Sequence, residues 1–354
     1  MTDEGARSAL AASVPRSVPR IPLNTLSISF GLAGLAGLWS VAGDALALPG
    51  LIDELLWGVA AVAWVWTIVA HTIRGSKSSE TLLSQLKHPA QGPIAAIIPS
   101  VGMLLGAHFY RFWPLGGTVL VAVSILAGAL FAGWILAYWH SGPLTPAAFH
   151  GGYLLPTVGA SLIAATASSR VGLGGISQGA FAIGIFFAVI IYAILLARVA
   201  FFPPLPGALM PTIAIILAPP AIAGTAWFTL YGERADPISM GLLGILVLMI
   251  LLQLFLIRIY RTLSFTLGFW SFTFPVAAAA SYAIEWFTIT RFAGWQAASV
   301  AALVVATAVV VAVAVRSIIL VMTVRRGARR AERPLRHADA VVEQVGDGDA
   351  SRGP

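Results

Sequence analysis

The stretch GALMPTIAIILAPPAIAGTAWFTLY, residues 207–231, is apolar and long enough to cross a bilayer, yet it contains Pro211, Pro219 and Pro220. A proline removes an amide donor and clashes with the carbonyl four residues back, so this helix must kink or unwind at membrane depth. The carbonyls that are freed in this way are tolerated only where protein or water covers them. The segment is therefore either an internal helix bent to fit its neighbours or a helix that lines a permeation path.

Composition fixes the class of protein. Of 354 residues, 58% are apolar and only 10% are charged, and the mean hydropathy is +0.89, which excludes an ordinary soluble domain. The apolar runs are too long for the strands of a transmembrane barrel, so an all-α integral membrane protein is expected. There is no cysteine, which excludes disulfides and thiol chemistry. The net charge of +7 lies mostly at the ends of the apolar runs, which indicates membrane orientation rather than a nucleic-acid partner.

Ten apolar runs follow one another with short connections, so we expect one ten-helix transmembrane domain over residues 23–324. The predicted spans are 23–42, 51–73, 92–109, 115–139, 151–169, 177–198, 208–231, 238–259, 268–287 and 294–323. Residues 1–22 are expected to form an N-terminal tail, and residues 325–354 a tail that is first basic and then disordered.

Lysine and arginine predict the orientation. The loops after the even-numbered spans hold Arg74, Lys77, Lys87, Arg198, Arg258 and Arg261, and both tails are rich in arginine. The opposite loops hold only Arg111, Arg170, Arg234 and Arg291, offset by several carboxylates. By the positive-inside rule, both termini are expected to be cytoplasmic, in a multi-pass protein of the cell (inner) membrane.

Helix breakers occur in alternate spans. The odd-numbered spans contain Gly31, Gly34, Gly37, Pro99, Gly102, Pro156, Gly159, Pro211, Pro219, Pro220 and Pro275, whereas the even-numbered spans have no interior proline. Broken helices with small residues suit an inner ring around a cavity, and uniformly apolar helices suit an outer ring facing lipid. We therefore expect five helical hairpins around a central pore, with odd helices inside and even helices outside, and no even-numbered span lining the cavity.

Three segments carry a resemblance to a known family. GGYLLPTVGASLIAA (151–165), LMPTIAIILAPPAIAG (209–224) and FWSFTFPVAAAA (269–280) resemble spans of the tellurite-resistance/dicarboxylate transporter family, which includes the plant slow-type anion channels. The resemblance implies a bundle of five hairpins, assembled as a homotrimer with a pore in each protomer. It also implies conduction of small inorganic or organic anions past a phenylalanine of the ninth span, and Phe274 is the matching residue.

A phenyl ring across a narrow pore excludes water, so an anion cannot pass without a large desolvation cost. Ordinary core packing is the alternative role for Phe274, since the chain has 18 phenylalanines. Anion selectivity is expected from dipoles near the kinks, where Thr157, Ser161, Thr212, Thr225, Ser271 and Thr273 lie, although each hydroxyl could equally join helices. The predicted pore-lining and kink residues are Pro99, Pro156, Thr157, Pro211, Thr212, Pro219, Pro220, Ser271 and Pro275.

Other chemistry is sparse in the sequence. No cofactor motif, metal-spaced histidine set or paired carboxylates of a hydrolase occur, so neither an enzyme nor a metal protein is expected. His71, His108 and Glu285 fall near span ends, and the lack of a charge at mid-membrane favours a passive pathway. The alternatives are an ion-coupled exporter of tellurite, sulfite or a C4-dicarboxylate and, less consistent with the proline pattern, a membrane scaffold.

Overall fold

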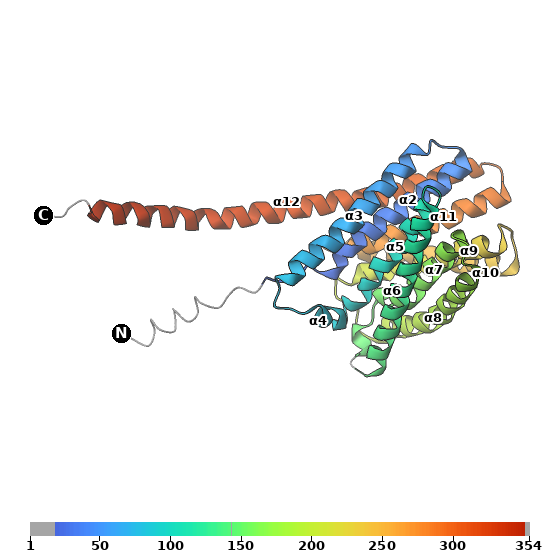
Figure 1. Ribbon diagram of the computed structural model, residues 1–354, viewed down its shortest axis with the longest axis horizontal. Helices are drawn as coiled ribbons and strands as arrows, with labels where there is room; N and C mark the ends of the chain where they lie inside the picture. Colours follow the sequence, from blue (N-terminus) through green and yellow to red (C-terminus); the bar gives the residue numbers. More distant parts are fainter. Residues whose placement is uncertain (1–17, 143, 351–354) are drawn as a thin grey trace. The chain divides into compact units, whose positions relative to one another are not determined.

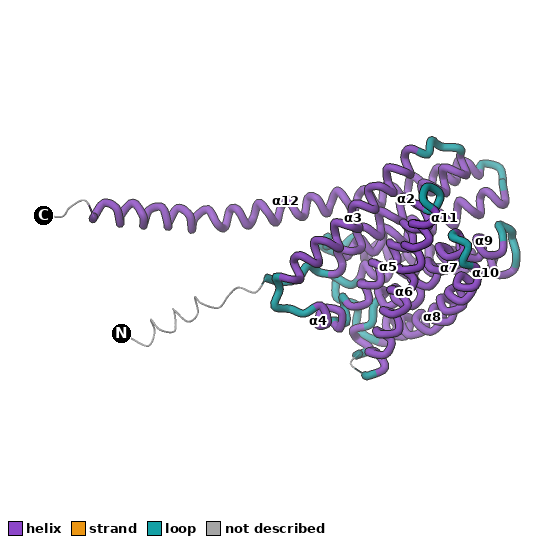
Figure 2. The backbone as a smooth tube through the Cα atoms, in the orientation of Figure 1, coloured by secondary structure: helices purple, strands orange, loops and turns teal. Residues whose placement is uncertain are grey.

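The computed structural model describes residues 18–142 and 144–350, with side chains described up to Val324 and at Arg326. Within these residues the secondary structure is helical, and no strand occurs (Figure 2). The chain divides into two units, residues 1–310 and residues 311–354. The cavities that bear on function lie within the first unit.

Five segments of the chain begin with an irregular turn and continue as an α-helix, and we call them the interrupted segments. They are η1 (Leu23–Leu26) with α2 (Ser27–Leu46), η2 (Gly92–Ala96) with α5 (Ile97–Phe109), η4 (Gly151–Leu154) and η5 (Leu155–Gly159) with α7 (Ala160–Arg170), η6 (Met210–Leu217) with α9 (Ala218–Tyr231), and η7 (Leu267–Phe272) with α11 (Thr273–Thr290) (Figure 1). All these turns are 3₁₀ helices except η5, which is a π-helix. Pro93, Pro156 and Pro211 stand in the first two positions of η2, η5 and η6, where a proline costs no helical hydrogen bond.

The other long helices run without interruption, and we call them the continuous helices. They are α3 (Leu51–Ser76), α6 (Pro114–His140), α8 (Gly174–Phe201), α10 (Pro237–Tyr260) and α12 (Trp295–Ala350), while the short α4 (Leu82–Lys87) and η3 (Pro146–Ala148) lie in connections. In α6 and α10 the only proline is the first residue. The Asp236 carboxylate caps α10 by accepting the amides of Ile238 and Ser239, at 3.0 and 2.9 Å.

Nine segments of the described chain are long and apolar enough to cross a membrane. The sequence predicted ten, and the difference is the fifth predicted span. There, the π turn at residues 155–159 leaves an α-helix of only 11 residues, α7. The all-α membrane class is confirmed, whereas the count of ten spans stays a prediction.

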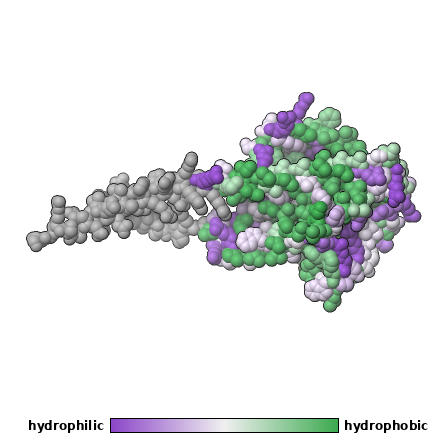
Figure 3. Space-filling model, turned by 90° about the horizontal axis from the view of Figure 1, so that it is seen from above, coloured by the Kyte–Doolittle hydropathy of each residue, from purple (hydrophilic) through white to green (hydrophobic). Residues whose placement is uncertain are grey.

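The interrupted segments contact one another in a closed cycle, in which α2 packs against α5, α5 against α7, α7 against α9, α9 against α11, and α11 against α2. Each of α3, α6, α8 and α10 packs against the interrupted segment that precedes it. Between 50 and 72% of the apolar window is buried in four interrupted segments, but only 11 to 22% in α3, α6, α8 and α10. Apolar residues accordingly cover much of the face drawn in Figure 3.

Glycines allow the interrupted segments to approach closely. A Cβ at Gly31 would clash with the Thr273 side chain, and a Cβ at Gly224 would clash with the Tyr282 ring. Tyr282 is fully buried, and its hydroxyl donates to the Ser239 carbonyl at 3.0 Å, so this ring has no room to move away. Small residues thus fix the spacing between α9 and α11.

Gly224→Ala is expected to lower the stability of the purified protein by about 1–3 kcal/mol, because the new methyl group overpacks the site against Tyr282. The matched control is Gly244→Ala in α10, where a Cβ meets no atom within 4 Å and stability should be unchanged or slightly higher. Thermal unfolding in detergent measures both variants. Equal melting temperatures for the two would contradict the close packing of α9 on α11.

Candidate functional site

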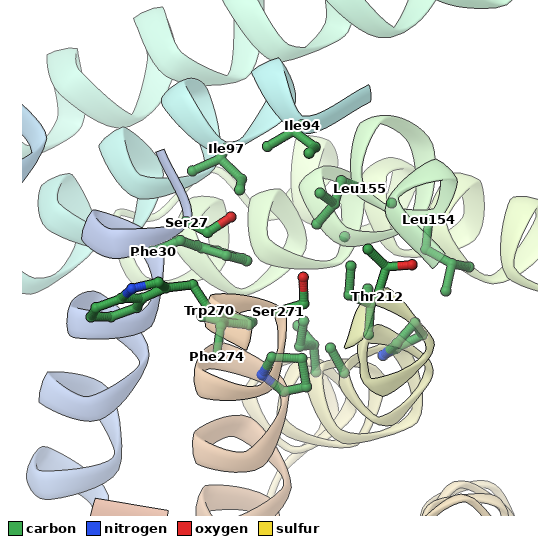
Figure 4. Close-up of a pocket in the computed structure, with 17 residues that line it drawn as sticks. Ser27, Phe30, Ile94, Ile97, Leu154, Leu155, Thr212, Trp270, Ser271 and Phe274 are labelled. Atoms are coloured by element: carbon green, nitrogen blue, oxygen red, sulfur yellow. The ribbon is translucent and has the colours of Figure 1, made fainter. Parts of the chain in front are cut away.

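A small cavity, which we call the inner cavity, lies among the first turns of the interrupted segments. Its volume is about 30 Å³, so it holds water but not a hydrated anion. All five interrupted segments line it, and no continuous helix does: the lining is Ser27, Phe30, Ile94, Ile97, Gly152, Leu154, Leu155, Gly159, Thr212, Ile215, Ala218, Pro219, Ile222, Trp270, Ser271, Phe274 and Pro275 (Figure 4). Because the segments begin here, this is the end of the bundle that the sequence predicts to be cytoplasmic.

A larger cavity, the outer cavity, lies among the last turns of the same segments and has a volume of about 320 Å³. All five interrupted segments line it as well, and its polar and charged lining residues are Ser40, Asp44, His108, Tyr110, Arg111, Thr166, Arg170, Thr225, Ser281 and Glu285. Trp57 of α3 also lines it, so the expectation that no even-numbered span reaches a cavity is wrong here. The indole Nε1 of Trp57 donates to Ser40 Oγ at 3.0 Å.

Two residues, Phe274 and Ile222, line both cavities. The Phe274 ring stacks on Phe30 with centroids 3.7 Å apart and planes 9° from parallel. Gly34 also lies against Phe274, and a Cβ there would be 2.9 Å from Phe274 Cδ2. Phe274 is only 6% exposed, and it lines both the inner and the outer cavity.

The structure brings some of the predicted site residues together and not others. Thr212, Pro219, Ser271 and Pro275 line the inner cavity beside Phe274. The remaining five line neither cavity: they are Pro99, Pro156, Thr157, Pro211 and Pro220. Of these, Pro220 faces an apolar crevice between α8 and α10, and Thr157 is buried without a hydrogen-bond partner for its hydroxyl among the described residues. They shape the interruptions rather than the cavity walls.

Comparison with known proteins identifies the family of the chain. A protein-family model described as "SLAC1: Voltage-dependent anion channel" matches residues 20–318. The chain belongs to the SLAC1 family. The resemblance read from the sequence is thereby confirmed, and with it a multi-pass membrane protein of a family of anion channels and transporters.

Relatives of the SLAC1 family occur in bacteria and plants. The chain is 24% identical to the tellurite resistance protein TehA homolog of Haemophilus influenzae over 270 residues, which cover 75% of this chain and 81% of that protein. It is also 24% identical to the S-type anion channel SLAH2 and to the guard cell S-type anion channel SLAC1 of Arabidopsis thaliana, over 75% of this chain. The matched regions cover 53% and 50% of these two plant channels, so the chain spans about half of their length.

Phe30, Trp57 and Arg170 are cavity residues that the sequence did not identify. Phe30 lies one helical turn before Gly34, and this spacing places both on the face of α2 that meets Phe274. The four-residue spacing of Phe30 and Gly34 is the sequence signal that could have predicted this contact. Trp57 and Arg170 carry no comparable local signal, because their neighbours in the cavity come from distant parts of the chain.

Most charged side chains near the cavities of this SLAC1-family protein are paired. Arg111 forms an ion pair with Glu54 and approaches Asp53 at 3.9 Å. His108 Nε2 lies 3.2 Å from Glu54 Oε2, and its ring stacks on Trp57. At the other end, His71 Nε2 lies 2.9 Å from Thr25 Oγ1. No group of three or more His, Asp or Glu residues that could hold a metal ion occurs in the described part of the chain.

His150 precedes η4 and fixes the start of that segment. Its Nδ1 accepts the Gly152 amide at 3.1 Å, so the neutral ring carries its proton on Nε2. The side chain is fully buried, and this burial lowers the pKa of His150 to about 4. A protonated His150 would therefore be a buried charge that has also lost its hydrogen bond to Gly152.

Acidification is expected to destabilise the protein through His150. The pKa of this ring in the folded state, about 4, is below its ordinary value of 6.5, so its contribution to stability is complete above pH 6.5 and is lost as the pH falls toward 4. Between pH 7.5 and pH 5 the loss amounts to about 2 kcal/mol. His150→Asn should show a smaller decrease in melting temperature over this range.

The matched control for this experiment is His88→Asn. His88 is exposed, and its Nδ1 accepts the Ala90 amide at 3.2 Å, which is the same local hydrogen bond without the burial. This variant should keep the pH dependence of the wild type. A pH dependence that is identical in the wild type and His150→Asn would show that His150 is not the titrating group.

Proposed function

We propose that this chain is a membrane anion channel whose pathway runs through a single protomer, from the inner cavity to the outer cavity, and is gated by Phe274. The observation that carries the proposal is that the Phe274 ring is a shared wall of two cavities, each lined by all five interrupted segments. Membership of the SLAC1 family supports small inorganic or organic anions as the substrate class. The same membership argues against an enzyme.

The preference for anions is supported by helix orientation. The α-helices of the interrupted segments begin beside the inner cavity, which Ser27 of α2, Ile97 of α5, Ala218 of α9 and Phe274 of α11 line from their first turns. The first turn of a helix carries a partial positive charge, so several helix dipoles add at one place. The Ser271 and Thr212 side chains supply further dipoles at the wall (Figure 4).

The proposed architecture is five hairpins around the pathway, with interrupted segments as the inner ring and continuous helices as the outer ring. It is supported by the closed cycle of contacts among the interrupted segments and by the difference in burial between the two groups. The fifth hairpin would pair α11 with α12, and Ala277 and Ile284 do share a cluster with Leu303 and Ala306.

Further parts of the proposal rest on the sequence. Residues 23–324 would form the ten-helix domain, flanked by tails at residues 1–22 and 325–354. The positive-inside rule supports an inner-membrane protein with both termini cytoplasmic. A homotrimer surrounded by lipid follows from the family resemblance alone. Residues 1–17 and 351–354 lie outside the described part of the chain.

The second candidate function is an ion-coupled exporter of tellurite, sulfite or a C4-dicarboxylate. It is favoured by the relative named as a tellurite resistance protein and by Glu285, a carboxylate that lines the outer cavity. A channel conducts down the anion gradient whatever the proton gradient, whereas a coupled exporter needs that second gradient. Flux measurements with and without a proton gradient separate the two.

Phe274→Ala is expected to raise the anion flux of purified protein in liposomes at least about tenfold, which corresponds to removing ~1.4 kcal/mol from the barrier. The flux should be measured for chloride, nitrate, sulfite and malate. Removal of the ring joins the two cavities, so the increase should appear without a proton gradient. The matched control is Phe228→Ala, because Phe228 is similarly buried, at 3% exposed, but lines neither cavity.

An equal rise in flux for Phe228→Ala would mean that general loosening of the bundle, and not the gate, is responsible. A Phe274→Ala variant that stays silent, together with a wild type that moves one anion only with a proton gradient, would replace the channel by the coupled exporter.

A further inference from the structure

Arg170 and Glu285 are two charged residues of the outer cavity that form no ion pair with any described residue. Arg170 is the last residue of α7 and is exposed, while Glu285 lies on α11 and is half-buried. The other arginine of the cavity, Arg111, is paired with Glu54 and Asp53. Glu285 is held by one hydrogen bond, which Thr225 Oγ1 donates to its Oε2 at 2.8 Å.

Arg170 and Glu285 line the same cavity, so the cation attracts an anion that enters it and the carboxylate repels that anion. An arginine that a carboxylate does not saturate keeps its planar fork of N–H donors available, and that fork matches an oxyanion. A carboxylate in the same cavity opposes the entry of such an anion.

Further titratable groups lie around Glu285, and carboxylates predominate. The charged or titratable groups on the elements around the cavity include Asp44 of α2, Asp53 and Glu54 of α3, His108 of α5, Tyr110 and Arg111 after it, Arg170 of α7, Glu233, Arg234 and Asp236 after α9, Tyr282 with Glu285 on α11, and Arg291 after it. Residues 295–310 of α12 carry no charge.

Some of the neighbouring groups have polar partners of their own, and Glu233 is exposed. His108 is beside Glu54, Asp236 caps α10, and the Tyr282 hydroxyl donates to the Ser239 carbonyl. Asp44 is exposed at the cavity rim, where water screens its charge. Glu285 is therefore the group whose charge most directly decides whether an anion can lie beside Arg170.

We propose that Arg170 and Glu285 form an outer binding site for one small oxyanion, and that this site takes up a proton on Glu285 together with the anion. The proton comes from water on the outer side and binds a carboxylate oxygen of Glu285. The neutral acid keeps the hydrogen bond from Thr225 and no longer repels the anion. This inference rests on the proposed anion pathway for its physiological meaning, but the binding site itself can be measured without transport.

The test is equilibrium binding of nitrate to the full chain purified in detergent. Nitrate is titrated against gluconate at constant ionic strength, at pH 5 and at pH 8, and the thermal unfolding of each sample is followed. A ligand that binds the folded state raises the melting temperature according to its concentration relative to its dissociation constant. For the wild type, the dissociation constant for nitrate should be at least about tenfold lower at pH 5, given the size of charge repulsion within one cavity.

Four variants assign the effect to residues. Glu285→Gln should bind nitrate at both pH values as the wild type does at pH 5. Arg170→Gln should lose the stabilisation by nitrate at both, and Arg170→Lys should retain part of it. Arg291→Gln is the matched control, because Arg291 lies in the loop after α11, at the same end of that helix as Glu285, but does not line the cavity, and it should behave as the wild type. Melting without nitrate reports whether each variant is folded.

Two results would overturn the inference. If Arg170→Gln, folded in the absence of nitrate, binds nitrate as tightly as the wild type, Arg170 is not the anion site. If Glu285→Gln keeps the pH dependence of the wild type, the proton binds elsewhere, and His108→Gln would then identify the residue.

Failure of the channel proposal gives a different pattern of results. Nitrate binding as expected, with no flux through either the wild type or Phe274→Ala, would retain the outer site and reject the pathway. The opposite pattern would reject the site and retain the pathway. In it, Phe274→Ala conducts nitrate, addition of Arg170→Gln to this variant leaves the half-saturating nitrate concentration of the flux unchanged, and the wild type shows no detectable nitrate binding.

Discussion

A bilayer interior offers no hydrogen bonds to the protein backbone, and this constraint explains the arrangement of the chain. A helix that breaks partway across must face protein or water at the break. In this protein every interrupted segment breaks in its first half, at η1, η2, η4 to η5, η6 or η7, and all of these turns except η1 line the inner cavity, where α2 takes part instead. The continuous helices have no break that frees backbone carbonyls, so they can form the lipid-facing surface of the bundle.

The position of Phe274, which lines both cavities, depends on close packing rather than on polar contacts. Its ring stacks on Phe30, and the absence of a side chain at Gly34, one turn further along α2, lets α2 and α11 approach closely there. An aromatic pair contributes only about 0.5–1.5 kcal/mol beyond the area it buries. If Phe274 is the gate that we propose, rotation of this one side chain would be enough to open it, because no ion pair of Phe274 has to break.

The sequence predicted the features that local chemistry determines. Apolar runs predicted the spans, and the predicted breakers Pro156 and Pro211 stand in the turns of two of the five interruptions. In a third interruption the turn contains Pro93, whereas the predicted breaker Pro99 lies beyond it in α5. The interruption at residues 267–272 contains no proline, and there the Thr266 side chain caps the 3₁₀ turn instead. The sequence did not predict that α7 would be as short as 11 residues. The reason is that hydropathy is the same whether the backbone is in an α, 3₁₀ or π conformation.

Features formed by distant parts of the chain could not be predicted in the same way. The contact of Phe30 with Phe274 joins residues 244 positions apart in a chain with 18 phenylalanines. The position of Trp57 at the outer cavity is fixed by a hydrogen bond from its indole to Ser40 of the neighbouring helix α2. Such facts follow from packing, which periodicity within a single span does not record.

The two ends of the proposed pathway differ in electrostatic character. Helix N-termini gather at the inner cavity, whereas four carboxylates stand against two arginines in and around the outer cavity. A fixed asymmetry of this kind cannot drive net transport, because the free energy of an anion in the two bulk solutions does not depend on it. The asymmetry can only make the flux saturate at different anion concentrations on the two sides.

Accumulation of the anion against its gradient would require that protonation of Glu285 and movement of Phe274 depend on each other. Ala278 and Ser281, which line the outer cavity along α11 between these two residues, are where such a dependence would have to be transmitted.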